Sequence, residues 1–418
     1  MRRKLLLLSG STVFGLLMLD LLLHWVMPPV LPGMATADTP NAALYSWALP
    51  PNFWMSDADP DTGRVSYFRT NARGWKDREH TLAKPETTFR IVVLGDSYTY
   101  GVVPMDQQYT TRVEAMLRER GWPQCEVISI GVSGWGTDQA LEALVSEGLR
   151  YQPDLVIYQF CSNDLLENLY PDPGMPPPTP FHCVKHFRYE RLPDGGLQKV
   201  AVAVKPRKLS FGQRIHRALR LSALVCLVDR AVRVRKGRPR RGALDGAIDL
   251  QANTLDPESP YFHYATGEEP SGTKRAWDLL DALVRRMDQE SRSRGAEFLV
   301  FSESGDEGRR SWFLEQGLIQ SDPGGDRVVA RGTTHPLDLK RPLKNLERIC
   351  EGAMIPMIRP TRSYTRYHND SHTNAEGNER MAADIIDYLT RHTRLAGMAE
   401  RRVGASGWRT SPASGLVR

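Results

Sequence analysis

Residues 90–101, with the sequence RIVVLGDSYTYG, indicate the fold class of this chain. Residues 91–94 form a short apolar run that ends at Gly95, the pattern of a buried parallel strand. An amphipathic stretch follows at residues 109–120 and predicts a helix. Ser97 therefore lies between a strand and a helix, at the edge where ligands of open parallel sheets collect.

The alternation of strand and helix recurs along the chain. Further apolar strands are predicted at residues 126–130, 155–160 and 298–301. Helices are predicted at residues 137–149, 274–294, 339–351 and 375–392. Strands that alternate with helices of this length favour an open parallel sheet covered on both faces, so we predict an α/β fold.

Ser97 is the candidate nucleophile. At a helix N-terminus, backbone N–H groups can receive a developing oxyanion. A serine hydroxyl is a weak nucleophile and needs a nearby base. The candidate base is His372, two residues after Asp370, whose carboxylate can orient the imidazole and stabilise its protonated form. The alternative for Ser97 is a helix N-cap, and its own heptapeptide does not separate the two interpretations.

Two loops after predicted strands offer hydrogen-bond donors for an oxyanion. Gly134 lies in a glycine-rich loop at residues 131–136, where a missing side chain lets the backbone N–H approach a substrate oxygen. Asn163 follows the next strand and can offer its amide N–H₂. Taken singly, each has a structural alternative, a turn glycine and a loop-ordering asparagine. The order and placement of the motifs together favour the catalytic interpretation.

No metal or cofactor is expected. A metal site beside Asp370 and His372 needs further ligands, and only His368 and Asn369 lie close in sequence. The cysteines show no CxxC pair and an irregular spacing, so neither a zinc site nor a dense disulfide framework is predicted. The sequence leaves open whether one or two disulfides form among the five cysteines, Cys125, Cys161, Cys183, Cys226 and Cys350.

The N-terminus predicts a membrane anchor at residues 1–27. A basic cap at residues 1–4 precedes an apolar run over residues 5–27. At about 1.5 Å per residue this run can cross a hydrocarbon core of about 30 Å. No Lys or Arg follows until Arg64, which places the N-terminus in the cytoplasm and the rest outside, in the periplasm or at the cell surface. A cleaved signal peptide ending near residues 35–37 is the alternative.

The remaining chain divides by composition. We predict a linker and entry segment at residues 28–87, a catalytic domain at residues 88–395 with an insertion at about 171–273, and a disordered tail at residues 396–418. Much of the net charge of +6 lies between residues 205 and 241 and near the C-terminus. A basic amphipathic helix predicted at residues 209–234 either lies on a membrane or an anionic polymer, or packs on the domain as a solvated insertion. No nucleic-acid-binding module is recognisable, and the oligomeric state is not predicted.

Four ordered blocks resemble the SGNH (GDSL-like) hydrolase family, over roughly residues 88–170 and 275–395. The resemblance implies a flavodoxin-like three-layer α/β/α fold and a Ser–His–Asp triad. It also implies an oxyanion hole formed by the N–H groups of Ser97 and Gly134 and the Asn163 side chain. The blocks are Gly95-Asp96-Ser97, Gly134, Asn163-Asp164, and Asp370 with His372.

The blocks depart from the family pattern at three positions. Ser129 stands where the second block usually begins with Asn, and Cys161 replaces the Gly of the third block. The last block is often Asp-x-x-His, which would select Asn369. Asn369 carries no negative charge, so we assign Asp370 to the triad. The Asp-x-His form resembles the SGNH-like domains associated with acetylation of bacterial exopolysaccharides.

These observations predict a membrane-anchored serine esterase of a bacterial surface. It would hydrolyse a carboxylic ester through an acyl-Ser97 intermediate, with a small ester or an acylated glycan as substrate and an O-acetyl ester on a glycan or exopolysaccharide as the expected case. Two alternatives stay open. An O-acyltransferase would pass the same acyl group to a sugar hydroxyl, and a non-catalytic binding module would keep only the fold.

Overall fold

The structure is a computed structural model, and it describes residues 2–26, 31–32, 39–170, 185–203, 222, 224–225, 227–228, 271–330 and 333–396. Most of the predicted insertion at residues 171–273, nearly all of the basic helix predicted at residues 209–234, and the predicted tail from residue 397 onward lie outside the described residues. The alternative cleavage site at residues 35–37 lies outside them as well.

The centre of the domain is a five-stranded sheet in which every pairing is parallel. The strand order β13-β9-β6-β4-β5 is that of a flavodoxin-like doubly wound sheet. All seven residues of β4 are buried, which explains its continuous apolar sequence. The strands are β4 (Phe89–Gly95), β5 (Cys125–Gly131), β6 (Leu155–Phe160), β9 (Glu297–Ser302) and β13 (Met357–Ile358).

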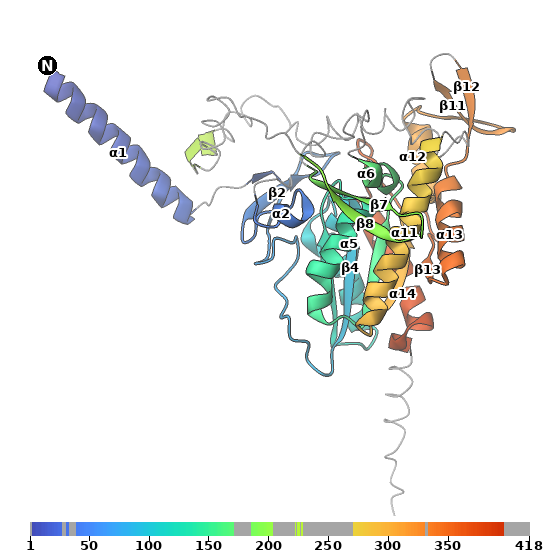
Figure 1. Ribbon diagram of the computed structural model, residues 1–418. Helices are drawn as coiled ribbons and strands as arrows, with labels where there is room; N and C mark the ends of the chain where they lie inside the picture. The colour runs from blue at the N-terminus through green and yellow to red at the C-terminus, as the bar shows by residue number, and fades with distance from the viewer. Residues whose placement is uncertain are drawn as a thin grey trace, which may run out of the picture.

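Helices cover both faces of this sheet (Figure 1). Alternate residues of β4 point to opposite faces, so Ile91 and Val93 belong to one hydrophobic cluster and Val92 and Leu94 to the other. The first face is covered by α4 (Tyr109–Glu119) and α14 (Ala375–His392). The second is covered by α5 (Thr137–Ser146), α11 (Ser271–Ser293) and α13 (Arg341–Ala353). The predicted α/β fold with a parallel sheet is confirmed.

Residues 39–76, which the sequence analysis placed in the linker and entry segment, contribute side chains to the second cluster. Trp47 and Trp135 are fully buried. The indole N–H of Trp47 donates a hydrogen bond to the Ser133 carbonyl at 3.0 Å, and the indole N–H of Trp135 donates one to the Trp47 carbonyl at 3.1 Å. Trp75 packs edge-on against Trp135. The elements here are α2 (Ala42–Tyr45), β2 (Trp54–Ala58) and β3 (Val65–Arg69), and β2 and β3 form an antiparallel hairpin.

Smaller elements complete the domain. At the carboxyl edge of the sheet lie α3 (Ser97–Tyr100), α6 (Asp164–Leu169) and α12 (Glu307–Glu315). Two short 3₁₀ helices are η1 (Met105–Gln107) and η2 (Gly148–Tyr151). Besides β2–β3, antiparallel pairing in the described residues joins β7 (Phe187–Arg191) with β8 (Leu197–Ala201), and β11 (Gly325–Ala330) with both β10 (Gln320–Asp322) and β12 (Thr333–Leu337).

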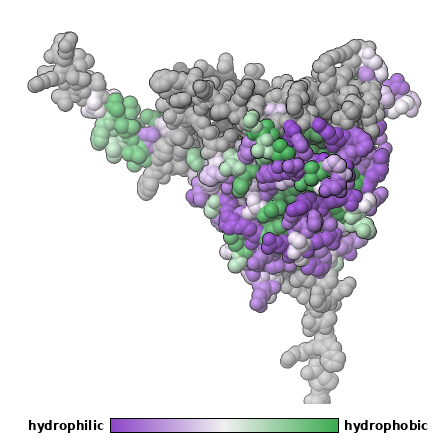
Figure 2. All heavy atoms as spheres, viewed as in Figure 1, coloured by the Kyte–Doolittle hydropathy of each residue, from purple (hydrophilic) through white to green (hydrophobic). Residues whose placement is uncertain are grey.

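A helix, α1 (Arg2–Val26), precedes the short strand β1 (Leu31–Pro32), which pairs with β2. Figure 2 shows hydrophobic residues gathered on α1, whereas the visible face of the domain is mostly hydrophilic. Phe14 and Leu21 are 66% and 63% exposed. In the part of the chain that the structure describes, no helix has the length and apolar character needed to cross a membrane. The transmembrane signal-anchor predicted over residues 1–27 is therefore not confirmed.

Candidate active site

Ser97 is the first residue of α3, directly after β4. The N-cap of this helix is Asp96, whose Oδ1 accepts a hydrogen bond from the Tyr98 N–H at 3.0 Å. The capping role that the sequence left open for Ser97 is thus taken by its neighbour. Gly95 permits the tight exit from the strand, because a side chain there would collide with Gln159. Ser97 is left half-buried at the carboxyl edge of the sheet.

Two hydrogen bonds connect Ser97, His372 and Asp370 in a continuous chain. Ser97 Oγ lies 2.8 Å from His372 Nε2, and His372 Nδ1 lies 2.6 Å from Asp370 Oδ1. The same Asp370 oxygen accepts the backbone N–H of His372 at 2.9 Å. The structure therefore brings together the three residues that the sequence analysis selected, and Asp370, not Asn369, contacts the imidazole. This is the arrangement of a nucleophile, a base and the group that orients the base.

The environment of the pair sets the charge of each member. Burial raises the pKa of Asp370, but the positive charge and hydrogen bonds of His372 outweigh burial and hold that pKa below the usual 3.8. Burial lowers the pKa of His372, but the Asp370 carboxylate outweighs it and raises that pKa above the usual 6.5. Asp370 is therefore ionised at neutral pH, and it favours the imidazolium that forms when His372 accepts a proton.

The predicted oxyanion donors have different surroundings. Gly134 has a φ of 76°, a conformation that favours glycine, and it lies in the loop between β5 and α5. Within the described residues, the backbone N–H groups of Ser97 and Gly134 donate to no protein acceptor. The Asn163 amide, by contrast, donates to Asp96 Oδ2 and to Glu167 Oε1, each at 3.1 Å. The structure thus places Asn163 between two carboxyl groups beside the nucleophile.

These two carboxyl groups are buried. Burial raises the pKa of Asp96, and it raises the pKa of Glu167 well above the usual range. Burial likewise raises the pKa of Asp164, which accepts hydrogen bonds from the Tyr158 hydroxyl and from the Cys161 N–H. Burial therefore disfavours the ionised form of each of these carboxyl groups.

A buried ionic network behind His372 was missed by the sequence analysis. Arg366 Nη1 donates to the Ser371 carbonyl at 2.6 Å and to the Tyr98 hydroxyl at 2.9 Å, so it contacts the residues next to both His372 and Ser97. Its Nη2 donates to Glu303 at 3.2 Å and to Asp306. A signal existed for the acidic partners, because both follow a predicted strand at the carboxyl edge of the sheet. Arg366 itself carried none.

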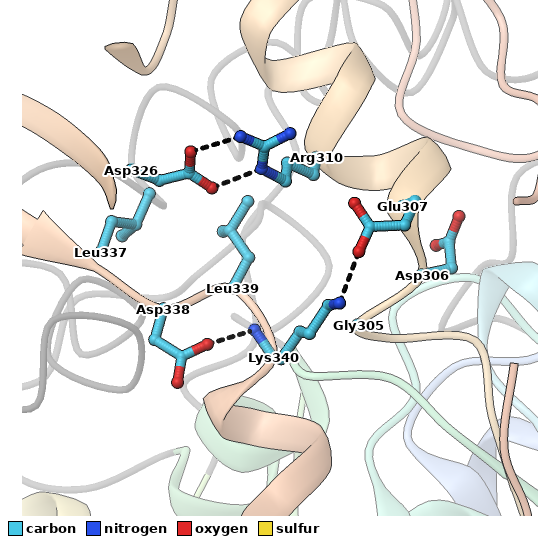
Figure 3. A pocket seen from close by; sticks show the side chains of 9 residues that line it. All are labelled: Gly305, Asp306, Glu307, Arg310, Asp326, Leu337, Asp338, Leu339 and Lys340. Atoms are coloured by element: carbon cyan, nitrogen blue, oxygen red, sulfur yellow. Dashed lines mark hydrogen bonds and ion pairs between the residues drawn. The ribbon is translucent and has the colours of Figure 1, made fainter. Parts of the chain in front are cut away.

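A pocket of about 310 Å³ lies beside this network (Figure 3). Arg310 forms a bidentate ion pair with Asp326, at 2.6 and 2.7 Å, and Lys340 pairs with Glu307. Among the described residues, each charged side chain that lines the pocket has an ionic partner within the protein. Ser97 is not among the residues that line it. The residues that line the pocket are Gly305, Asp306, Glu307, Arg310, Asp326, Leu337, Asp338, Leu339 and Lys340.

The sequence matches the GDSL-like lipase/acylhydrolase family over residues 93–336, more than half of the chain. The chain belongs to this family. It is therefore an ester hydrolase of the GDSL type. The matched residues include Ser97, Gly134 and Asn163, and the match ends before Asp370 and His372.

Solved structures of this kind resemble the chain at low identity. An acetyl xylan esterase, AlAXEase, is 11% identical, with a TM-score of 0.35, and the match covers 72% of this chain and 100% of that one. TesA is 11% identical, with a TM-score of 0.34, over 72% of this chain and 97% of its own. The lipase/acylhydrolase from Enterococcus faecalis is 13% identical, with a TM-score of 0.34, over 73% and 97%. No curated protein matches the chain significantly.

Proposed function

We propose that this ester hydrolase acts through an acyl-Ser97 intermediate with His372 as its general base. The observation that carries the proposal is the hydrogen-bonded chain from Ser97 Oγ through His372 to Asp370, with distances of 2.8 and 2.6 Å. It lies at the carboxyl edge of a parallel sheet, the usual location of a site in such folds. Ser97 is half-buried, whereas Asp370, the carboxylate of the triad, is buried.

The reaction follows from these contacts. His372 Nε2 takes the Ser97 proton as Oγ attacks the ester carbonyl, and the carbonyl oxygen becomes an oxyanion. The tetrahedral intermediate collapses, the ester C–O bond breaks, and the imidazolium gives its proton to the departing alcohol. His372 then takes a proton from water, whose oxygen attacks the acyl carbon. When this second intermediate collapses, the carboxylic acid leaves and Ser97 Oγ recovers its proton.

The oxyanion would be held by backbone donors. The N–H of Ser97 lies at the start of α3, and the N–H of Gly134 lies in the adjacent loop, and neither has a protein acceptor in the described part of the chain. Two such donors stabilise charge that is present only in the transition state. Asn163 would contribute only by exchanging one of its two carboxyl partners for the oxyanion.

We propose an O-acetyl ester on a glycan or exopolysaccharide as the substrate. The support is the Asp-x-His form of the last block, Asp370-Ser371-His372, which resembles the SGNH-like domains associated with acetylation of bacterial exopolysaccharides. The proposal of an extracytoplasmic location has separate support, the basic cap and apolar run at residues 1–27 and the lack of Lys or Arg before Arg64. Reporter fusions after residue 38 test that location in cells.

The test of the mechanism is hydrolysis of p-nitrophenyl acetate by the full chain beside Ser97→Ala and His372→Ala. Removing either member of a serine–histidine pair is expected to lower kcat by at least about a thousandfold. Ser311→Ala is the matched control, because this serine is exposed on α12. Circular dichroism checks that the variants fold. Turnover that survives in both Ser97→Ala and His372→Ala would refute the mechanism.

Acetate release from an O-acetylated polysaccharide tests the substrate. A second reaction contains a de-acetylated polysaccharide as acceptor and p-nitrophenyl acetate as acetyl donor. Acetate release that requires Ser97 supports the proposed hydrolysis. If the acetyl group is transferred to sugar hydroxyls without acetate release, the chain is an acyltransferase. If only the small ester is hydrolysed, the proposed glycan substrate is wrong.

A further inference from the structure

The loop that carries Asp370 and His372 depends on other elements for its position. Between β13 and α14 its one regular feature in the structure is an isolated bridge that pairs Arg366 with Thr373. A loop of this kind has many accessible conformations, so an accurate Ser97–His372 geometry requires contacts from outside it. Those contacts come from several elements. They include the buried Arg366 network, the hairpin β2–β3, and helix α12, whose Trp312 side chain donates to the carbonyls of Tyr367 and His368 at 2.7 and 3.2 Å and whose C-cap residue Gln316 donates to the His368 carbonyl at 2.7 Å.

The turn of the β2–β3 hairpin contacts the backbone directly before the triad carboxylate. Asp61 Oδ2 accepts the N–H of His368 at 2.9 Å, and Asp61 Oδ1 accepts the N–H of Asn369 at 2.8 Å. One carboxylate thus binds two successive amides with its two oxygens. A carboxylate acceptor strengthens a hydrogen bond and exposure to solvent weakens it, and both of these hydrogen bonds are exposed. They orient the peptide units that lead into Asp370.

Asp61 is itself held by its turn. Asp59 Oδ1 accepts the N–H groups of Asp61 at 3.1 Å and of Thr62 at 2.8 Å. The Asp59 N–H donates to the Arg64 carbonyl at 2.8 Å across the hairpin. This is the local hydrogen-bonding pattern by which aspartate stabilises turns. The strands of the hairpin therefore hold Asp61 in place, and Asp61 contacts the catalytic loop.

The same hairpin contacts the helix that begins at the nucleophile. Tyr100, the last residue of α3, donates its hydroxyl proton to Asp57, whose two oxygens lie 2.7 and 2.9 Å away. The buried Lys76 ammonium binds Asp57 at 2.6 Å and also the carbonyls of Gly101 at 2.7 Å and Val103 at 2.8 Å. Strand β2 and the residues after the hairpin therefore hold the segment that follows Ser97.

We propose that the β2–β3 hairpin is a brace that sets the position of His372 against Ser97, with Asp61 as a positioning residue for the general base. It holds the nucleophile segment through Asp57 and the base loop through Asp61. Residues 54–69 lie outside residues 93–336, the part that matches the family, as do Asp370 and His372. This inference rests on the proposed roles of Ser97 and His372.

Asp61→Ala in the full chain tests the brace. A small displacement of a catalytic group costs up to about a hundredfold in rate, so we expect kcat for p-nitrophenyl acetate to fall about 10- to 100-fold, with KM within about twofold of wild type. Asp61→Asn keeps one acceptor oxygen, and we expect an intermediate loss. The matched control is Asp194→Ala, another exposed turn aspartate, whose carboxylate accepts only the nearby Gly196 N–H among the described residues. Circular dichroism checks that Asp61→Ala and Asp194→Ala are both folded at the assay temperature.

A double-mutant cycle separates positioning of His372 from a general structural effect. If Asp61 acts through the imidazole, Asp61→Ala costs nothing further in the His372→Ala background. An equal loss in both backgrounds would overturn the proposal, as would an Asp61→Ala variant as active as Asp194→Ala.

A proton NMR signal reports on the brace without turnover. The Nδ1–H proton between His372 and Asp370 should resonate downfield in wild type and broaden in Asp61→Ala but not in Asp194→Ala. An unchanged signal would overturn the brace. Wild-type turnover that does not require Ser97 would overturn the proposed mechanism instead, so the two failures are distinguishable.

Discussion

Replacing Asp370 by Asn removes the negative charge beside His372 and keeps the size of the side chain. In the native site, one Asp370 oxygen accepts both the imidazole Nδ1–H at 2.6 Å and the His372 backbone N–H at 2.9 Å. An asparagine has one acceptor oxygen and one N–H₂ group. If its N–H₂ group faces Nδ1, the imidazole must carry its proton on Nε2. That tautomer cannot accept the proton of Ser97.

The expected loss follows from these two effects. A hydrogen bond to a charged group contributes about 1.5–3 kcal/mol, and here it acts on the imidazolium of the transition state. Since about 1.4 kcal/mol corresponds to a tenfold change in rate, losing this contribution lowers kcat by about 10- to 150-fold. The wrong tautomer lowers it further, to about ten-thousandfold in other serine–histidine–aspartate sites. We expect a total loss of about a hundredfold to ten-thousandfold.

The substitution also moves the pH dependence. The neutral imidazole is the active base, and the pKa of His372 lies above 6.5 because Asp370 outweighs the opposing effect of burial. Wild-type kcat/KM should therefore rise as pH passes through a value above 6.5 and level off at higher pH. Without the Asp370 charge, burial still lowers the pKa of His372, and the negative charges of Asp96 and Glu303 raise it by less, so the pKa of His372 falls. The rise then occurs at lower pH.

The assay is the pH profile of p-nitrophenyl acetate hydrolysis by wild type and Asp370→Asn. Asn369→Ala is the matched control, because this exposed neighbour occupies the Asp-x-x-His position and does not touch the imidazole. We expect this control to keep the wild-type pH profile. A variant Asp370→Asn with wild-type kcat, or with a lower kcat but the same midpoint, would refute the assigned role of the carboxylate.

Two further substitutions test the packing beneath the site. Lys76→Met removes a buried ammonium and leaves the partly buried Asp57 carboxylate without its ionic partner, so we expect a loss of about 3 kcal/mol in the free energy of unfolding, measured by urea denaturation. A wild-type midpoint would contradict this. Leu283→Ala removes a fully buried side chain of α11 and should cost about 2–5 kcal/mol, whereas Val145→Ala, exposed on α5, should cost little. Equal effects of the last two would contradict the assigned core.

The central sheet was predictable because its strands are buried on both faces. Such strands have nearly continuous apolar sequences, and the four runs predicted near residues 91–94, 126–130, 155–160 and 298–301 are strands β4, β5, β6 and β9. The fifth strand, Met357–Ile358, is too short to leave a pattern. Its place at the edge follows only from its pairing with β9.

The helices differ in how far their sequences specify them. The helix predicted at residues 375–392 matches α14, because its apolar positions recur with helical spacing and face the sheet. Helix α12 was not predicted, since its sequence is mostly polar and only Trp312 and Phe313 are buried. The same holds for β10, whose residues are all exposed. Elements with few buried positions carry little periodic signal.

The candidate site divides in the same way. Ser97 lies in a short motif after a predicted strand, so its position at the carboxyl edge followed from the strand–helix pattern. Asp370 and His372 lie in a short motif just before the last predicted helix, and their residue types and spacing marked them. Arg366 and Asp61 lie in loops, and their roles depend on partners that are distant in sequence. The Asp61–Asn369 contact spans 308 residues. Nothing local in the sequence marks such a residue.

The distance between Ser97 and His372 is set by tertiary packing, because the two residues are 275 positions apart. Helix α4 follows the nucleophile segment, and its first N–H, that of Tyr109, donates to the Asn378 side chain of α14 at 3.0 Å. The Asn378 amide in turn donates to the carbonyl of Thr373, next to His372, at 3.1 Å. Packing of α4 on α14 thus holds the loop at Thr373, and the β2–β3 hairpin contacts it at His368 and Asn369. A catalytic pair built from distant segments requires contacts of this kind, because nothing local in the chain sets the distance between its members.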